Sequence, residues 1–320
     1  MSESVKRSNP LMWFLDPLTS TASQSDPEYR YSWSKIAWML PLAIGILGLV
    51  VTAIGWATNS EQFYYSYLIG WAFCLSITIG AYFFVVIQHL TKARWSVVIR
   101  RIPEALIWSF PLLAVLSIPI LLGMHDLYHW THHDLFDPAS ANYDPVIAGK
   151  EAYLNTPFFL ARFAFYFLSW TWISYKLYTL SVRQDNDPHP EIAPKQRKYA
   201  AIGLALGAIT TAFAAFDILM SLDPHWFSTI FGIYFFAGSF MIIMAVMALV
   251  SMMLQRKGML TGLIKVDHYQ DLGKFLFGFV VFWAYIGFSQ YMLIWYGNLP
   301  EETVFYRHRL EHGWGTMSAI

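Results

Sequence analysis

The sequence has few charged residues, a single cysteine and no excess of positive charge. Charged residues make up 13% of the 320 residues, whereas about a quarter is usual in soluble domains, so a soluble globular fold is excluded. Cys74 alone cannot form a disulfide framework, a thiolate zinc site or an iron–sulfur cluster, and the C-x-x-C-H motif for covalent haem is missing. Lys and Arg number 21, as do Asp and Glu, so no basic surplus exists to bind nucleic acid.

Long apolar runs dominate the chain instead. Hydrophobic residues make up 56% of the sequence, and a bilayer core about 30 Å thick needs roughly 20 apolar helical residues per crossing. Seven segments meet that length, so the sequence predicts an all-α integral membrane protein, a polytopic transmembrane helical bundle. The predicted spans are Ile36–Ala57, Tyr67–Leu90, Ala105–Leu122, Pro157–Leu180, Tyr199–Met220, Phe227–Leu254 and Phe275–Tyr296. We expect an eighth span to begin at Gly313–Ile320, where the chain becomes apolar again.

Basic residues sort the segments between the spans into two sets. Seventeen Lys and Arg residues fall on one side of the predicted bundle and three on the other, with Arg162 left inside a span. Because cytoplasmic segments carry the excess of Lys and Arg, this distribution predicts a cytoplasmic amino terminus. The first 35 residues show no signal peptide, so the first span is expected to stay as an anchor. The chain then divides into a cytoplasmic segment 1–35, a seven-span bundle 36–296, and an outer loop 297–320 that includes the start of the further span.

Two charged side chains lie deep within predicted spans. At a rise of 1.5 Å per residue, Arg162 lies about 9 Å and Asp217 about 5 Å below the outer ends of the fourth and fifth spans. Their similar depth on consecutive helices predicts an Arg–carboxylate contact, because pairing offsets the cost of burying both charges. A structural ion pair is the simpler interpretation, and a proton path or a contact with a quinone head group is the alternative. Gln290 on the seventh span is expected at a similar depth.

His89 is the only histidine within a predicted span, at the inner end of the second one. A haem b held by two histidines needs ligands on facing helices at one depth, and no second histidine matches, so we expect no haem. His89 and the nearby Glu104 are instead candidates for an inner proton entry. The matching outer exit would use Asp217 with His125, Asp126 or Asp223.

The outer loop 123–156 concentrates histidines. His125 and His129 stand four residues apart, so on a helix they would share a face, as metal ligands often do. Spacing alone is weak evidence, and Tyr128 and Trp130 are typical of an interfacial belt, so we expect a loop that contacts a partner rather than a metal site. The residues expected to dock a partner subunit are His129, His132, His225, Glu301 and Glu302.

Two further motifs follow predicted spans at the outer surface. Asp223 and Pro224 come directly after the fifth span, which predicts a tight turn. Glu301 and Glu302 come after the seventh span and are close in sequence to two arginines. The simpler interpretation of these glutamates is a solvated, salt-bridged loop, and docking of a partner is the alternative.

Three stretches of the sequence resemble a known family. They are Ala93–Glu104, Met220–Ile230 and Trp295–Thr303, the last with the run Asn-Leu-Pro-Glu-Glu-Thr. Together they resemble the membrane subunits of bacterial alternative complex III, a quinol-oxidising respiratory assembly, and most of all its F-type subunit (ActF). The resemblance extends from the first span to Arg309. Members of that group are expected to have more spans than the seven found here.

This resemblance implies a multi-pass protein of the bacterial inner membrane that carries no cofactor of its own. Electrons would pass through haem c and iron–sulfur clusters in partner subunits: a multihaem cytochrome c subunit and an iron–sulfur subunit, beside a related quinone-binding membrane subunit. Contact of this chain with menaquinone or ubiquinone is compatible with the resemblance. The implied role is structural support of quinol oxidation together with a proton path. The alternative is a stand-alone secondary transporter or channel, which would place polar groups near the bilayer midplane in two repeated halves.

Overall fold

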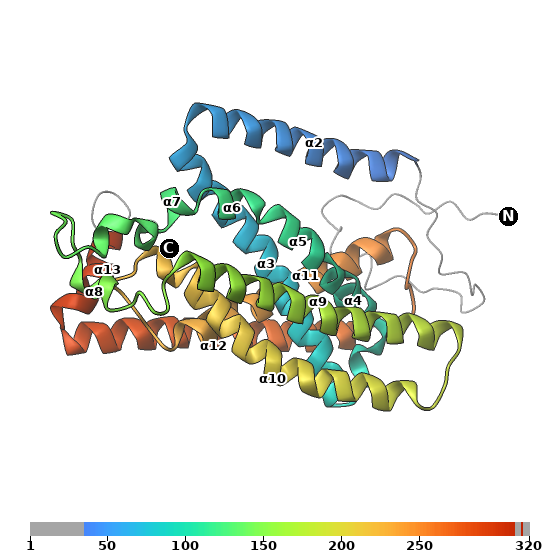
Figure 1. The fold of residues 1–320 in the computed structure, drawn as a ribbon. Coiled ribbons are helices and arrows are strands. Elements are labelled where there is room, and N and C mark those ends of the chain that lie inside the picture. The colour runs from blue at the N-terminus through green and yellow to red at the C-terminus, as the bar shows by residue number, and fades with distance from the viewer. Residues whose placement is uncertain (1–34, 311–314, 316–320) are drawn as a thin grey trace.

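The computed structural model describes residues 35–310 and residue 315, and this part of the chain contains helices and no β-strand (Figure 1). Six helical segments in it are long and apolar enough to cross a membrane. They are Met39–Thr58, Ser60–Leu90, Arg101–Leu122, Ile192–Leu222, Phe231–Arg256 and Val266–Gly297. The structure therefore agrees with the predicted all-α membrane bundle.

The helices fall into a long and a short class. The long ones are α2 (Lys35–Thr58), α3 (Ser60–Leu90), α9 (Thr156–Asn186), α10 (Ile192–Ile218), α11 (Phe231–Arg256) and α12 (Val266–Gly297). Between α3 and α9 lie η2 (Trp95–Val98), α4 (Arg101–Leu106), η3 (Ile107–Ser109), α5 (Phe110–Leu116), α6 (Ile118–Leu122), α7 (Met124–Leu127), η4 (His129–Thr131), η5 (His133–Leu135) and α8 (Pro145–Ala148). The short η6 (Met220–Leu222) follows α10, and α13 (Pro300–Leu310) follows α12.

The third predicted span is a broken helical segment rather than one continuous helix. Pro111 and Pro119 lie in the first turns of α5 and α6, where a residue without a backbone donor is tolerated. The hydroxyls of Ser109 and Ser117 donate to the carbonyls of Leu106 and Ala114, both at 2.7 Å. Side chains thus satisfy carbonyl groups at the breaks, as membrane helices with kinks require.

Helix α9 corresponds to the fourth predicted span and is not one of the six apolar segments. It is 31 residues long and begins at a cap in which the Asn155 side chain accepts from the amide of Phe158 at 3.0 Å. It packs along α10, but it carries Arg162 and Lys176 as well as several hydroxyl side chains. A seventh crossing by α9 therefore stays a prediction.

Helix α3 forms the centre of the bundle, with α10 and α11 packed against it (Figure 1). The Tyr82 side chain is buried, and its hydroxyl donates to the carbonyl of Gly203 on α10 at 2.8 Å. On the other side, a Cβ at Gly80 would lie 2.1 Å from the backbone oxygen of Ser239 on α11. Only glycine permits this approach, so α3 is held tightly between two neighbours.

The bundle has two ends with different residue types (Figure 1). The connections 91–100, 187–191 and 257–265 lie at one end, which we call the basic end. The segment 123–155, the connection 219–230 and α13 lie at the other, which we call the histidine end. Because α3, the broken segment 101–122, α9, α10, α11 and α12 run in alternate directions, these connections mark the two ends of the bundle.

Helix α2 stands apart from the other long helices (Figure 1). It packs against the start of α3, where the indole nitrogen of Trp56 donates to the hydroxyl of Tyr64 at 3.1 Å. Along most of its length its apolar side chains are exposed, with Leu40 64% and Leu47 63% accessible. The helix therefore presents an apolar surface that the rest of the described chain does not cover.

Residues 300–310 of the predicted loop 297–320 form a helix. Helix α12 ends at Asn298, which adopts a left-handed conformation with φ +46°. Pro300 then begins α13, a position where its missing N–H has no helical partner to lose. Asn298 is a sequence signal for the end of α12, and Pro300 is a signal for the start of a new helix. These two signals outweigh the polar composition of the segment, which favoured a loop.

Two predictions fall on residues outside the described part of the chain. The cytoplasmic segment 1–35 lies there apart from Lys35, and the expected eighth span at Gly313–Ile320 lies there apart from Gly315. Both stay predictions, as does the cytoplasmic location of the amino terminus.

Candidate functional sites

The predicted contact between Arg162 and Asp217 is confirmed. Nε of Arg162 donates to Oδ2 of Asp217 at 2.7 Å and Nη2 to Oδ1 at 3.0 Å, forming a bidentate pair between α9 and α10. The Tyr166 hydroxyl, one helical turn further along α9, also donates to Oδ2 at 2.7 Å. Asp217 is only 1% exposed. This buried carboxylate therefore has three donors.

The Arg162 guanidinium is also largely enclosed, with its side chain 10% exposed. Nη1 donates to the carbonyl of Tyr153 at 3.0 Å, and Cζ lies 3.9 Å and 4.3 Å from the ring centres of Tyr153 and Phe158. Aromatic faces stabilise a guanidinium without competing for its hydrogen bonds. Protonation of Asp217 would weaken this arrangement, so the geometry favours the structural ion pair, and a proton path through Asp217 stays a prediction.

A cavity of 350 Å³ lies beside this ion pair at the histidine end. Tyr153 and Ser221 line it, and the Ser221 hydroxyl donates to the backbone oxygen of Asp217 at 2.5 Å. Asp223 lines the same cavity, so the structure places this predicted exit residue near the partners of Asp217. Gln290 lines a different cavity, of 820 Å³, beside α13.

The histidines of segment 123–155 form a surface stack. His125 and His129 do not share a helical face, because α7 ends at Leu127 and η4 begins at His129. His125 stacks on His132 instead, with ring centres 3.9 Å apart, and Nε2 of His132 contacts the His125 carbonyl at 3.0 Å. Asp126 is exposed nearby and does not line the cavity beside Asp217. Within the described residues, no group of three or more His, Cys, Asp or Glu side chains is arranged to hold a metal ion.

His225 joins two parts of the histidine end. Its Nε2 lies 2.5 Å from Oδ2 of Asp144, and Oδ1 of Asp144 accepts from the amide of Val146 at the start of α8. Partial burial raises the pKa of Asp144, but the bonds from His225 and the amides of α8 outweigh it and lower that pKa below its ordinary value. The predicted docking residue His225 therefore has a partner within the chain, and it ties segment 123–155 to the α10–α11 connection.

The predicted docking residues Glu301 and Glu302 lie in the first turn of α13, where negative charge favours the helix. Glu301 is exposed and Glu302 is half-buried. Phe305 on the same helix stacks on Trp226 with ring centres 3.7 Å apart and planes 4° from parallel. This stack fixes α13 against the α10–α11 connection.

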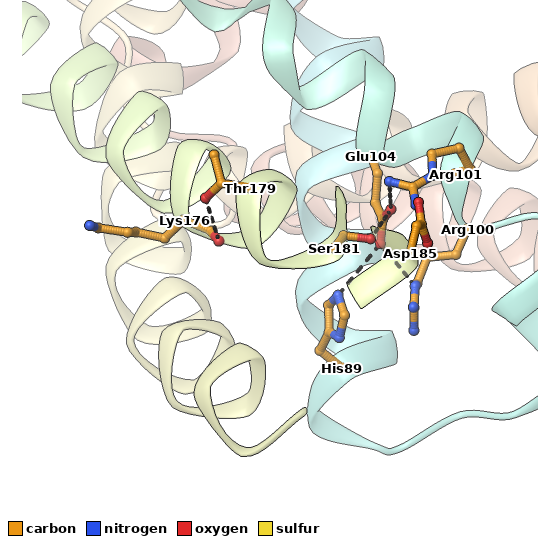
Figure 2. A network of polar contacts seen from close by, with 8 residues as sticks. All are labelled: His89, Arg100, Arg101, Glu104, Lys176, Thr179, Ser181 and Asp185. Carbon is orange, nitrogen blue, oxygen red and sulfur yellow. Dashed lines mark hydrogen bonds and ion pairs between the residues drawn. The ribbon is translucent and has the colours of Figure 1, made fainter. Parts of the chain in front are cut away.

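The predicted inner pair, His89 and Glu104, forms the centre of a second buried cluster, at the basic end (Figure 2). Nε2 of His89 lies 3.7 Å from Oε1 of Glu104, beyond hydrogen-bond length. Arg100 Nε donates to the same oxygen at 2.9 Å, while Arg101 Nη1 lies 3.2 Å from Oε2. The Ser181 hydroxyl on α9 donates to Oε2 at 2.6 Å. Glu104 is 1% exposed, so this carboxylate is buried among cations and a hydroxyl.

Residues that the sequence did not single out complete both clusters. Arg101 also pairs with Asp185 at the end of α9, whereas Lys176 points away from the cluster (Figure 2). The spacing of Arg100 and Glu104 by four residues was a usable signal for a helical ion pair. Ser181 and Tyr166 gave no such signal, because their contacts depend on how α9 lies against its neighbours.

Comparison with protein-family models found no matching family, and no curated protein matched the sequence. The site chemistry is therefore argued from the residues of this chain. They form two buried carboxylate clusters at opposite ends of one helical bundle, each with arginine and hydroxyl partners.

Proposed function

We propose that this chain is a cofactor-free integral membrane subunit of a bacterial quinol-oxidising respiratory complex of the alternative complex III type. The observation that carries the proposal is the distribution of buried charge, with Asp217 and Glu104 held at opposite ends of an apolar bundle. The sequence supplies neither the thiolates nor the matched histidines that hold electron carriers within a bundle. The resemblance of three stretches to the F-type subunits supports the same proposal.

The proposed topology has seven spans, with the basic end in the cytoplasm. Helix α9, at 31 residues, extends about 46 Å, enough to cross a hydrocarbon core of about 30 Å. Its charged Arg162 is neutralised by Asp217 within the bundle, which makes its crossing acceptable in lipid. The excess of basic residues at the basic end supports its cytoplasmic location.

Contact with other membrane subunits is proposed to use α2. Its exposed surface is apolar from Met39 to Trp56 apart from Thr52, and it carries Gly45 and Gly48, beside which no atom of the described chain lies within 4 Å of an added Cβ. Small residues let a neighbouring helix approach closely in a membrane. In the proposed complex, a helix of the related quinone-binding subunit packs along this surface.

Proton handling is proposed at the basic end rather than at Asp217. Glu104 has the imidazole of His89 as a neighbour, and His89 lines a cavity of 550 Å³. The distance of 3.7 Å between the two groups leaves room for a proton to enter by a small rearrangement. Asp217 has three firm donors and no such neighbour among the residues that contact it.

Purification of the full chain from its native membrane in mild detergent tests the proposed assembly. We expect it to elute together with haem c and iron–sulfur proteins, detected by the absorbance of haem and by iron and sulfide content. A chain that elutes alone as a monodisperse species, under conditions that keep other respiratory complexes intact, would contradict the proposal and favour a stand-alone transporter.

Replacing Glu104 by Gln in the assembled complex tests the proton role. We expect slower proton uptake in vesicles at near-normal quinol turnover, because Gln keeps the hydrogen bond from Ser181 but cannot carry a proton. Asp185→Asn is the matched control, since it removes an exposed carboxylate that also pairs with Arg101. Equal effects of the two variants on proton uptake would contradict a specific role for Glu104.

A further inference from the structure

A cavity of 550 Å³ lies at the basic end, next to the Glu104 cluster, between the end of α3, the connection 91–100, α9 and the start of α10. Four cationic side chains line it and no carboxylate does. They are Lys92, Arg94, Arg100 and Arg197. Arg100 is neutralised by Glu104, while Lys92, Arg94 and Arg197 form no ion pair within residues 35–310. The cavity therefore has a net positive lining.

Two buried amides in this lining have polar atoms without partners. Nε2 of Gln196 and Oε1 of Gln88 are inaccessible to solvent and form no hydrogen bond within the described chain. The two residues are 2% and 4% exposed, and both line the cavity. A buried donor and a buried acceptor of this kind are normally satisfied, so they indicate a ligand that both accepts and donates hydrogen bonds.

The backbone at Lys92 is a third, independent indication. Lys92 has φ +54°, the left-handed conformation that closes helix α3, and the amide of Ala93 donates to the carbonyl of Gln88 at 3.1 Å across this turn. Glycine is the usual residue at such a position because a Cβ is strained there. A lysine at a position that favours glycine indicates that its ammonium group takes part in binding at the cavity that it lines.

We propose that this cavity binds the phosphate of an anionic phospholipid with a glycerol head group. The phosphate oxygens accept from Lys92, Arg94, Arg197 and the amide of Gln196, and a head-group hydroxyl donates to Gln88. Basic pockets between helices at a membrane surface bind anionic head groups in this way. The exposed side chain of Val97 at the same cavity lies where the acyl chains would leave it.

The test uses the full chain, purified in detergent and freed of lipid, with phosphatidylglycerol, phosphatidylcholine and glycerol 3-phosphate as probes. Native mass spectrometry gives the dissociation constant of each. We expect phosphatidylglycerol to bind at least tenfold more tightly than phosphatidylcholine. Lys92→Gly and Arg197→Gln are each expected to weaken it about fivefold. Lys195→Gln, which removes an exposed cation outside the cavity, is the matched control and should bind as the original does.

Lys92→Gly also separates binding from folding, because glycine relieves the left-handed strain. We expect its thermal midpoint without lipid to equal or exceed that of the original chain while its affinity falls. Glycerol 3-phosphate binding as tightly as the lipid would assign the phosphate site to a soluble ligand and reject the lipid. Equal binding of the two lipids, or equal losses in Lys195→Gln and the cavity variants, would overturn the proposal.

Discussion

At the scale of single residues, the two buried carboxylates differ in the groups that surround them. Asp217 receives three hydrogen bonds, two from Arg162 and one from Tyr166, and no imidazole contacts it among the described residues. Glu104 lies beside His89, which approaches without a hydrogen bond. The first arrangement stabilises one charge state, and the second is the one to which we assign the proposed proton exchange. A buried charge is therefore not by itself evidence of a proton path.

Replacing Asp217 by Asn is expected to destabilise the bundle by about 3 kcal/mol, because it leaves the Arg162 guanidinium buried without a counter-charge. Thermal unfolding of the purified chain in detergent measures the loss. Asp223→Asn is the control, as this carboxylate is only half-buried. The double variant Asp217→Asn with Arg162→Met should recover part of the stability. An unchanged midpoint in the single variant would contradict the structural role.

The pair between Asp144 and His225 gives an expected dependence on pH. The pKa of Asp144 is lowered in the folded chain, so its contribution to stability is present above its ordinary value and is lost as pH falls through the lowered one. At pH values below about 4, we expect the thermal midpoint of the original chain to decrease. In Asp144→Asn we expect a smaller decrease over the same pH range. A midpoint that depends on acid pH equally in both proteins would show that other carboxylates account for it.

At the scale of helices, the apolar runs predicted most of the long helices. They did not predict that the third span is divided into short helices. The predicted span Ile36–Ala57 and helix α2 differ by one residue at each end. Helix α3 begins seven residues before its predicted span, because Asn59 caps it and the polar first turn continues the helix. The break near Ser109 was not predicted, since the prolines alone do not say where a kinked segment divides.

The candidate site was predictable where depth along a helix was enough. Arg162 and Asp217 were matched by rise per residue alone, and the structure confirms their contact. Predicting the contacts of Tyr166 and Ser181 requires knowing how α9 is rotated about its own axis. The apolar periodicity of a lipid-facing helix does not define that rotation. The stacking of His125 on His132 depended on an irregular loop path, for which the sequence carries no periodic signal.

The close approach of α3 and α11 makes a prediction about Gly80. A Cβ there would meet the backbone of Ser239, which cannot move without shifting α11, so Gly80→Ala is expected to lower stability by about 1–3 kcal/mol. Gly278→Ala is the matched control, because no atom lies within 4 Å of its added Cβ, and it should be neutral or slightly stabilising. Unfolding midpoints in detergent compare them. Equal midpoints would mean that the helices separate at little cost.

At the scale of the whole molecule, charged residues are distributed unevenly along the bundle axis, and exposed apolar surface is distributed unevenly across it. Along its axis, arginines and lysines gather at the basic end, while most of the described histidines lie at the other. Across its axis, α3 is buried at the centre and α2 is exposed at the edge. The first division suits an orientation in the membrane and the second suits a lateral partner, which together favour a subunit of an assembly.

The orientation can be tested with single cysteines in a chain whose own cysteine, Cys74, is replaced by Ala. Lys195 at the basic end and Asn142 at the histidine end are both exposed, so a cysteine at either position is accessible to a reagent on its own side. Because the sequence assigns seventeen of the 21 basic residues to the predicted side that includes the basic end, we expect that end to face the cytoplasm. A maleimide that cannot cross the membrane should then label Asn142→Cys in intact cells, and Lys195→Cys only after permeabilisation. Labelling in the opposite order would contradict the proposed orientation. It would place the cavity that we propose to bind a lipid phosphate in the outer leaflet.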